Sequence, residues 1–224
     1  MLELIRDFDI LDAFWLTIQL TLVSALLALV LGTIVAVMRV SPVKVLNLAG
    51  AAYVNLVRNT PLTLIVFFCF YCLYILLQWH ISPLSARSST HAFQWGVIGL
   101  GLYHATFVAE ALRSGINTVP VGQAEAARAI GLDFGQSLSN VILPQAFRGA
   151  IAPLGNAMIA LTKNTTVVAT IGVAEASYAM RYAIEDRADM LFTIFFIMAL
   201  GFVILTLPMG ILFTRLSRRM AVQR

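Results

Sequence analysis

The sequence predicts an all-α membrane protein: a single domain over residues 1–224 built as a bundle of five transmembrane helices. Only 12% of the 224 residues are charged and 60% are hydrophobic, whereas a water-soluble domain usually carries about 25% charged residues. Several apolar runs are also long enough to cross a hydrocarbon layer of roughly 30 Å, which takes about 20 helical residues. Most of the surface is therefore expected to face lipid or other membrane helices.

Polar stretches and helix-breaking residues separate the apolar runs and place the predicted spans. Residues 1–12 mix acids with apolar residues, as in a helix that lies at a membrane surface. A partly apolar helix over residues 45–58 ends at Asn59-Thr60-Pro61, where Thr60 is the expected N-cap of the next helix and Pro61 its first residue. The predicted spans cover residues 13–38, 60–77, 93–112, 149–171 and 190–213, and a polar connection covers residues 113–147.

The basic residues predict the orientation of the bundle, because cytoplasmic loops carry an excess of Lys and Arg. With five spans, the basic residues on one side are Arg39, Lys44, Arg58, Arg113, Arg128, Arg148, Arg215, Arg218, Arg219 and Arg224. Those on the other side are Arg6, Arg87, Arg181 and Arg187. The first side is therefore expected to be cytoplasmic, with the N-terminus outside, the C-terminus inside and residues 113–147 in the cytoplasm.

The polar connection is predicted to contain two short helices joined by a sharp turn. Pro120 can open the first helix, which an alanine-rich stretch continues, and Gly131 can close it in the left-handed conformation. Asp133 can cap the second helix, with Gln136 in the position of a capping box. The connection is therefore expected to be a compact unit.

The first of these helices is too short to be stable alone in water, so it needs a surface on which to dock. Its alanines form a flat face, flanked by Glu125 and Arg128 at i, i+3 spacing. Two interpretations remain open on these grounds alone. The helix inserts into another protein, or it is an amphipathic connector that packs on its own bundle.

Motifs in and around this connection resemble those of ABC importer permeases. Glu125-Ala126-Ala127, then Gly131, then Leu143-Pro144 resemble the EAA signature of that family, with Val141 where the signature has Ile. Residues 56–64, 103–132 and 161–175 are similar to the branch that transports polar amino acids. Residues 38–47 add a similarity to glutamate permeases of actinobacterial type. The resemblance covers nearly the whole chain.

The resemblance implies a type I, MetI-like importer permease in a bacterial plasma membrane. Its partners would be a second permease, expected to be a different homologous chain, an external solute-binding protein and two ATP-binding subunits that dock on residues 120–144. ATP and Mg would be bound by those subunits, since this chain lacks the Gly-x-x-x-x-Gly-Lys-Ser/Thr motif, and no cofactor, enzymatic activity or nucleic-acid binding is expected of it. The residues expected to couple to the ATPase are Gln123, Glu125, Ala126, Ala127, Arg128, Gly131, Leu143 and Pro144.

Ionisable residues inside the predicted spans are candidates for a substrate pathway, because intramembrane charge is costly. Lys163 either meets substrate carboxylates or forms a structural pair. Glu110 either pairs with Arg113 at the membrane margin or belongs to a gate or cavity, and the break at residues 58–60 either lines a cavity or is a simple kink. The candidate pathway residues are Lys163, Asn164, Thr165, Thr166, Glu110, Arg58, Asn59 and Thr60.

Other function classes find less support in the sequence. His80, His91 and His104 have no metal-ligand spacing, so no metal site is expected. A membrane-embedded enzyme would need a nucleophile and a base, for which Ser24 with His104 is the conceivable pair. A passive pore would need no ATPase. The expected substrate is glutamate or another acidic or amide amino acid, with arginine, histidine and cystine as alternatives.

Overall fold

The computed structural model describes residues 2–220, with side chains from Leu4 onward, and within that range the regular structure is entirely helical. Arg224, which entered the orientation argument, lies outside the described residues. The elements are α1 (Leu2–Asp7), α2 (Ile10–Val40), α3 (Lys44–Arg58), α4 (Leu62–Phe67), η1 (Phe68–Leu76), α5 (Ser88–Ile116), α6 (Val121–Ala129), α7 (Phe134–Ser137), η2 (Leu138–Ile142), α8 (Leu143–Asn164), η3 (Thr165–Ile171), α9 (Ala176–Asp186), η4 (Ala188–Met190) and α10 (Leu191–Met220).

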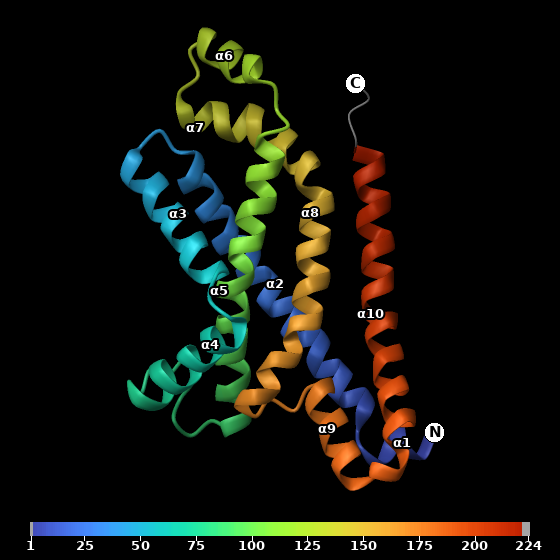
Figure 1. Ribbon diagram of the computed structural model, residues 1–224. Helices are drawn as coiled ribbons and strands as arrows, with labels where there is room; N and C mark the ends of the chain where they lie inside the picture. The colour runs from blue at the N-terminus through green and yellow to red at the C-terminus, as the bar shows by residue number, and fades with distance from the viewer. Residues whose placement is uncertain (1, 221–224) are drawn as a thin grey trace.

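Three long helices, α2, α5 and α8, form the centre of the bundle, and α10 stands at its edge against α8 (Figure 1). Glycines bring these helices close together, as small residues do in membrane bundles. A Cβ added to Gly32 of α2 would lie 2.6 Å from the side chain of Val108 on α5. A Cβ on Gly115 of α5 would overlap the carbonyl oxygen of Ala146 on α8.

Three helical segments are long and apolar enough to cross a membrane on their own: Ile10–Val40, Ser88–Ile116 and Ala188–Met220. The predicted spans 13–38, 93–112 and 190–213 lie within them. Two further spans arise only if bent pairs are counted: α3 with α4 and η1, bent by 104°, and Phe134–Ile171 with α9, bent by 58°. Five spans are thus the upper count that the helices allow.

The break at residues 59–61 differs in detail from the prediction. Thr60 does not cap the following helix; its hydroxyl donates to the carbonyl of Leu56, 2.8 Å away, inside α3. The next helix begins at Leu62, and the carbonyl of Pro61 accepts its first backbone hydrogen bonds, from Leu64 and Ile65. Thr60 therefore closes α3, because its side chain satisfies a carbonyl at that helix's C-terminal end.

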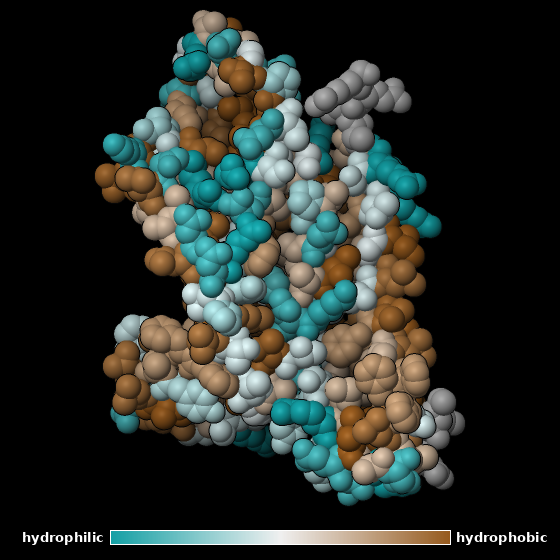
Figure 2. Space-filling view, viewed as in Figure 1, coloured by the Kyte–Doolittle hydropathy of each residue, from teal (hydrophilic) through white to brown (hydrophobic). Residues whose placement is uncertain are grey.

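Helices α5, α8 and α10 extend beyond the predicted spans. The basic residues after residue 213 continue α10 to Met220, with Arg218 and Arg219 in its last turn, where cations interact favourably with the helix dipole. The connection 113–147 contains the end of α5 and the beginning of α8 besides its two short helices. Figure 2 shows hydrophobic side chains along α10, whereas hydrophilic and neutral ones gather over α5 and α8 in the middle of the same face.

Candidate functional site: a projecting loop and a polar cavity

The predicted glycine turn of the polar connection is present and forms a Schellman motif. Gly131 has a φ of 88°. Its N–H donates to the carbonyl of Arg128, and the N–H of Leu132 donates to the carbonyl of Ala127, at 3.0 and 3.1 Å. These are the two backbone bonds that define this helix ending. The turn requires a residue that tolerates the left-handed region, and glycine does so without a Cβ penalty.

The second helix of the connection begins as predicted. The N–H of Gln136 donates to Oδ1 of Asp133 at 2.8 Å, and the N–H of Asp133 donates to Oε1 of Gln136 at 3.1 Å, which completes a capping box. This helix, α7, continues through the π-helical η2 into α8. Pro144 lies in the first turn of α8 and has no N–H for the carbonyl four residues before it, which accounts for the looser turn there.

Helix α6 lies at the far tip of the molecule and presents most of its surface outward (Figure 1). Only Ala127 is buried among its residues. Two apolar side chains at its ends, Val121 and Ile130, are 74% and 77% exposed, which is unusual for a helix that projects from the bundle. Glu125 and Arg128 are exposed and form no ion pair with any residue of the described chain.

The residues expected to couple to an ATPase therefore fall into two groups. Those of α6 and its turn share one projecting unit: Gln123, Glu125, Ala126, Ala127, Arg128 and Gly131. Leu143 and Pro144 lie apart from it, at the junction of η2 with α8. Their position suits them to hold the base of the unit rather than its outward surface.

A polar cavity of about 490 Å³ lies between the end of α3, the C-terminal half of α5 and α8. Its charged residues are Arg58, Glu110 and Arg113. The other lining residues are Phe107, Ala111, Ser114, Asn117, Pro153, Asn156, Ala157 and Ala160. Arg58, Ser114, Asn117 and Asn156 are exposed, so the chain leaves this cavity open on one side.

Glu110 is held by two guanidinium groups. Arg113, one turn further along α5, donates to Oε2 at 3.0 Å, which is the predicted i, i+3 pair. Arg39, at the end of α2, donates to Oε1. The pairing of Arg39 with Glu110 could not be predicted from the sequence, because 71 residues separate the two. Its side chain is only 16% exposed, and one carboxylate facing two guanidiniums leaves the cluster with net positive charge.

Lys163 has no ion pair or hydrogen-bond partner for its ammonium group in the described part of the chain, and its side chain is exposed. The structural-pair interpretation thus finds no partner carboxylate there. Lys163 follows Asn156 by seven residues and Ala160 by three on α8, so it lies on the helix face that lines the cavity, about a turn beyond it.

The neighbours of Lys163 are arranged differently from one another. Asn164 Nδ2 lies 3.1 Å from Nε2 of His104 on α5. Thr165 is buried, and the hydroxyls of Thr165 and Thr166 donate to carbonyls three residues back, at 2.8 Å. The helix changes there from α to 3₁₀. These three polar side chains are satisfied within the protein, which distinguishes them from Lys163.

The residues at the break after α3 divide between the cavity and the kink. The guanidinium of Arg58 lies 5.4 Å from the ring centre of Phe107 and lines the cavity. Asn59 and Thr60 are not among the cavity residues; Asn59 caps α3 and Thr60 bonds within it. Arg58 is thus placed with the candidate pathway, whereas its two neighbours belong to the kink.

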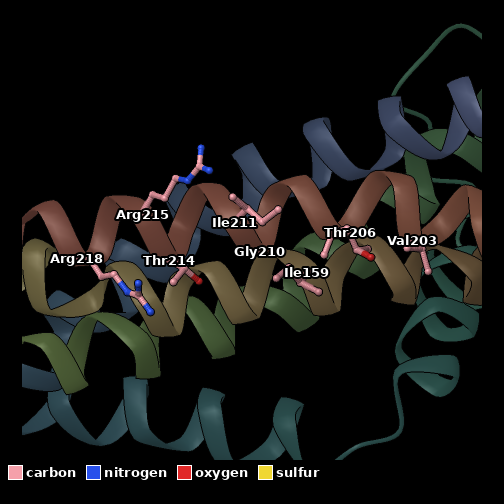
Figure 3. A pocket seen from close by; sticks show the side chains of 9 residues that line it. Ile159, Val203, Thr206, Gly210, Ile211, Thr214, Arg215 and Arg218 are labelled. Atoms are coloured by element: carbon pink, nitrogen blue, oxygen red, sulfur yellow. The ribbon is translucent and has the colours of Figure 1, made fainter.

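A second hollow, of about 590 Å³, is an apolar groove between α8 and α10 (Figure 3). Its apolar lining includes Ile159 of α8 and Val203, Leu207 and Ile211 of α10. Gly210 lies in the middle of the groove, and Arg215 and Arg218 lie at one end. A smaller pocket between α8 and α10 shares Ile159 and Gly210 with this groove and Asn156 with the polar cavity. The groove and the cavity therefore lie on adjoining faces of α8.

The pair considered for a membrane-embedded enzyme is not assembled among the described residues. Nε2 of His104 is close to Asn164, and neither His104 Nδ1 nor Ser24 Oγ has a hydrogen-bond partner within residues 2–220, so the two do not form a nucleophile and base pair. Among the described residues, no three or more His, Cys, Asp or Glu side chains are grouped so that they could hold a metal ion.

Comparison with known proteins finds a family model, "Binding-protein-dependent transport system inner membrane component", that matches residues 9–222. The chain is 55% identical to the glutamate transport system permease protein GluC of Corynebacterium glutamicum, covering 96% of both chains. It is 34% identical to a probable glutamine ABC transporter permease, GlnM, of Bacillus subtilis, over 93% of this chain and 92% of the relative. A crystal structure of an amino acid ABC transporter with histidines superposes with a TM-score of 0.79 at 27% identity, covering 94% of this chain and 93% of that one.

Proposed function

The chain belongs to the inner membrane components of binding-protein-dependent transport systems, and from this premise we propose that it imports glutamate or a closely related acidic amino acid. As a permease subunit it is an integral membrane protein and does not itself catalyse a reaction, because a partner ATPase hydrolyses ATP. The substrate proposal draws on the named relative, a glutamate permease 55% identical over nearly the whole chain.

The charge of the polar cavity is the observation that carries the substrate proposal. Its lining holds Arg58 and Arg113 against the single carboxylate of Glu110, which Arg39 already neutralises. Lys163 adds a further cation on the same face of α8. Glutamate and aspartate carry two carboxylates and one ammonium group, so their net charge is negative. A path with excess positive charge favours them over a basic amino acid, which like charges would repel.

We infer that the cavity is completed by the second permease subunit. Guanidinium and amide groups are not stable against lipid hydrocarbon, so they must face protein or water. This chain leaves them open on one side, and the apolar groove between α8 and α10 lies directly beside them. A helix of the partner permease packed in that groove would seal the edge of the path. Five spans, with the α6 end in the cytoplasm, are part of the same proposal.

Helix α6 is the proposed contact with the ATP-binding subunits. Its exposed Val121 and Ile130 would be covered by a cleft in the partner, and Glu125 and Arg128 are free to pair across the interface. The solute-binding protein would deliver substrate on the opposite side. Reconstitution with the two ATP-binding subunits tests the contact, since an α6 variant should lose ATPase binding while still inserting in the membrane.

The experiment that tests the substrate is uptake of labelled glutamate by cells with and without the gene, competed by each other amino acid. We expect deletion to abolish uptake, and only aspartate, glutamate or glutamine to compete. Unchanged glutamate uptake after deletion would overturn the substrate proposal, and arginine, histidine and cystine would then be tested.

Two variants test whether the cations of the cavity select the substrate. Arg58→Gln and Lys163→Gln should reduce uptake of glutamate more than uptake of glutamine, because only glutamate carries the extra carboxylate. Lys44→Gln is the matched control, since Lys44 is exposed at the start of α3, away from the cavity. Equal loss of both substrates in the first two variants would contradict a role in charge selection.

A further inference from the structure

We infer that His104 is a positioning residue that sets the direction of Lys163 and Arg58 in the substrate path, although it cannot touch substrate itself. The inference rests on the proposed function and extends it to a residue outside the cavity lining. His104 lies in the middle of α5 and has 0% of its surface exposed. Two of its contacts, with Asn164 and with Phe107, lead separately to the two cations.

The first contact acts through Asn164. His104 Nε2 and Asn164 Nδ2 are 3.1 Å apart and join α5 to the last residue of α8. Successive residues of a helix are rotated by 100°, since a turn takes 3.6 residues. With Asn164 held against α5, the neighbouring Lys163 is fixed about 100° further round α8, on the side of the helix that carries the cavity residue Asn156.

The place of this contact matters because the helix changes there. Directly after Asn164 the chain passes from α8 into the 3₁₀ segment η3. A long 3₁₀ stretch within a helix often marks a hinge or local strain. Without the bond to His104, the rotation of Lys163 would depend on backbone that is tightening from one helix type to another. The bond to His104 therefore fixes the direction of the Lys163 side chain at the junction of the two helix types, where the backbone alone determines that direction least.

The second contact acts through Phe107, which lies one turn along α5. The rings of His104 and Phe107 have centroids 5.6 Å apart, and the guanidinium of Arg58 lies 5.4 Å from the Phe107 ring centre. A cation over an aromatic face is attracted by the ring quadrupole. The His104 ring thus supports the platform on which Arg58 rests, and one buried side chain links both cations.

The shape of the histidine provides a matched pair of variants. The amide of glutamine reaches about as far as Nε2, so His104→Gln can keep the bond to Asn164. The amide of asparagine reaches only as far as Nδ1, which has no partner in the described part of the chain, so His104→Asn loses that bond. Both replacements are polar amides, and they differ chiefly in reach.

Two measurements on the assembled transporter test the inference. The first is the KM and maximal rate of glutamate uptake. A net hydrogen bond is typically worth about a factor of five in an equilibrium, so His104→Asn should raise KM by roughly that factor, whereas His104→Gln should stay within about twofold of the unchanged protein. The second needs no substrate: Lys163→Cys is labelled with a water-soluble methanethiosulfonate, with Cys69 and Cys72 replaced by Ala. Its labelling rate should change with His104→Asn and be restored with His104→Gln.

Thermal stability of the purified complex accompanies both measurements. Wild-type KM and labelling in His104→Asn would overturn the inference. Equal impairment in both variants, together with equally lowered thermal stability, would also overturn it and make His104 a packing residue. If the unchanged protein does not transport glutamate, the proposed substrate fails, but the labelling comparison still decides whether His104 directs Lys163.

Discussion

Replacing Gly131 tests whether the closed turn after α6 is needed for transport. A Cβ at this position would meet no atom within 4 Å, so an added side chain clashes with nothing. The full cost of substitution is therefore the backbone conformation, with a φ of 88°. For a residue other than glycine this region costs roughly 1–2 kcal/mol, with Asn the least affected. If the conformational cost of Gly131→Ala is about 1 kcal/mol, the population of the Schellman turn relative to open conformations falls about fivefold.

Proline at the same position is expected to be far more disruptive. It fixes φ near −65° and removes the N–H that donates to Arg128. The expected order of transport activity is therefore glycine, asparagine, alanine, valine and then proline, with proline inactive. Insertion in the membrane should be unchanged throughout, because α6 projects from the bundle and only one of its residues is buried.

The assay is uptake by proteoliposomes that contain the partner permease, the ATP-binding subunits and the binding protein, with ATP hydrolysis measured alongside. Gly122→Ala is the matched control, since Gly122 lies within α6 in ordinary helical conformation and also has open space around it. Alanine there should favour the helix by up to about 1 kcal/mol and leave uptake intact. Wild-type uptake by Gly131→Pro, or equal loss in the two alanine variants, would refute the reasoning.

Three further predictions concern packing, charge and docking. Gly115→Ala places a Cβ against a backbone carbonyl of α8, so it should destabilise the purified protein by about 1–3 kcal/mol or more and lower its melting temperature markedly. Gly210→Ala meets only an ordinary contact at 3.6 Å and should leave the melting temperature unchanged. Glu110→Gln removes the carboxylate shared by two guanidiniums, so it should destabilise the protein by roughly 2 kcal/mol and more than a charge-neutral change elsewhere on α5; unchanged melting would count against it. Glu125→Lys should abolish uptake and ATPase binding while membrane insertion stays normal, and full uptake would remove Glu125 from the contact.

Features that depend on neighbouring residues could be predicted from the sequence. The capping box of Asp133 and the turn at Gly131 follow from residues within a few positions of one another, and both are present. The break at Thr60 was predicted in the right place with the wrong role for the side chain, because a threonine hydroxyl can serve the helix before it as well as the helix after it.

Features that depend on the packing of distant segments could not be predicted. Arg39 meets Glu110 across 71 residues, and His104 meets Asn164 across 60. In both cases one of the two partners is a polar residue within the predicted span 93–112, Glu110 or His104, and its position shows that it needs a partner without showing which residue that is. The sequence did identify Glu110, Lys163 and Arg58 as unusual, but only the packing of α5 against α3 and α8 separates cavity residues from those of the kink.

The connection of the projecting unit to the cavity bears on how ATP hydrolysis could act at a distance. The unit, α6 and its turn, follows α5 along the chain and is joined to α8 through α7 and η2. Helices α5 and α8 supply most of the cavity wall. At its base, the hydroxyl of Thr118 donates to the carbonyl of Gly115 at 2.7 Å, and Gly149 of α8 lies so close that a Cβ there would be 2.6 Å from that hydroxyl oxygen. Such close contact leaves no space for α5 and α8 to move relative to each other at this point. If α6 is the contact with the ATP-binding subunits, as proposed, a displacement that it passes to α5 or α8 would shift both walls of the cavity together, because packed elements move as rigid bodies.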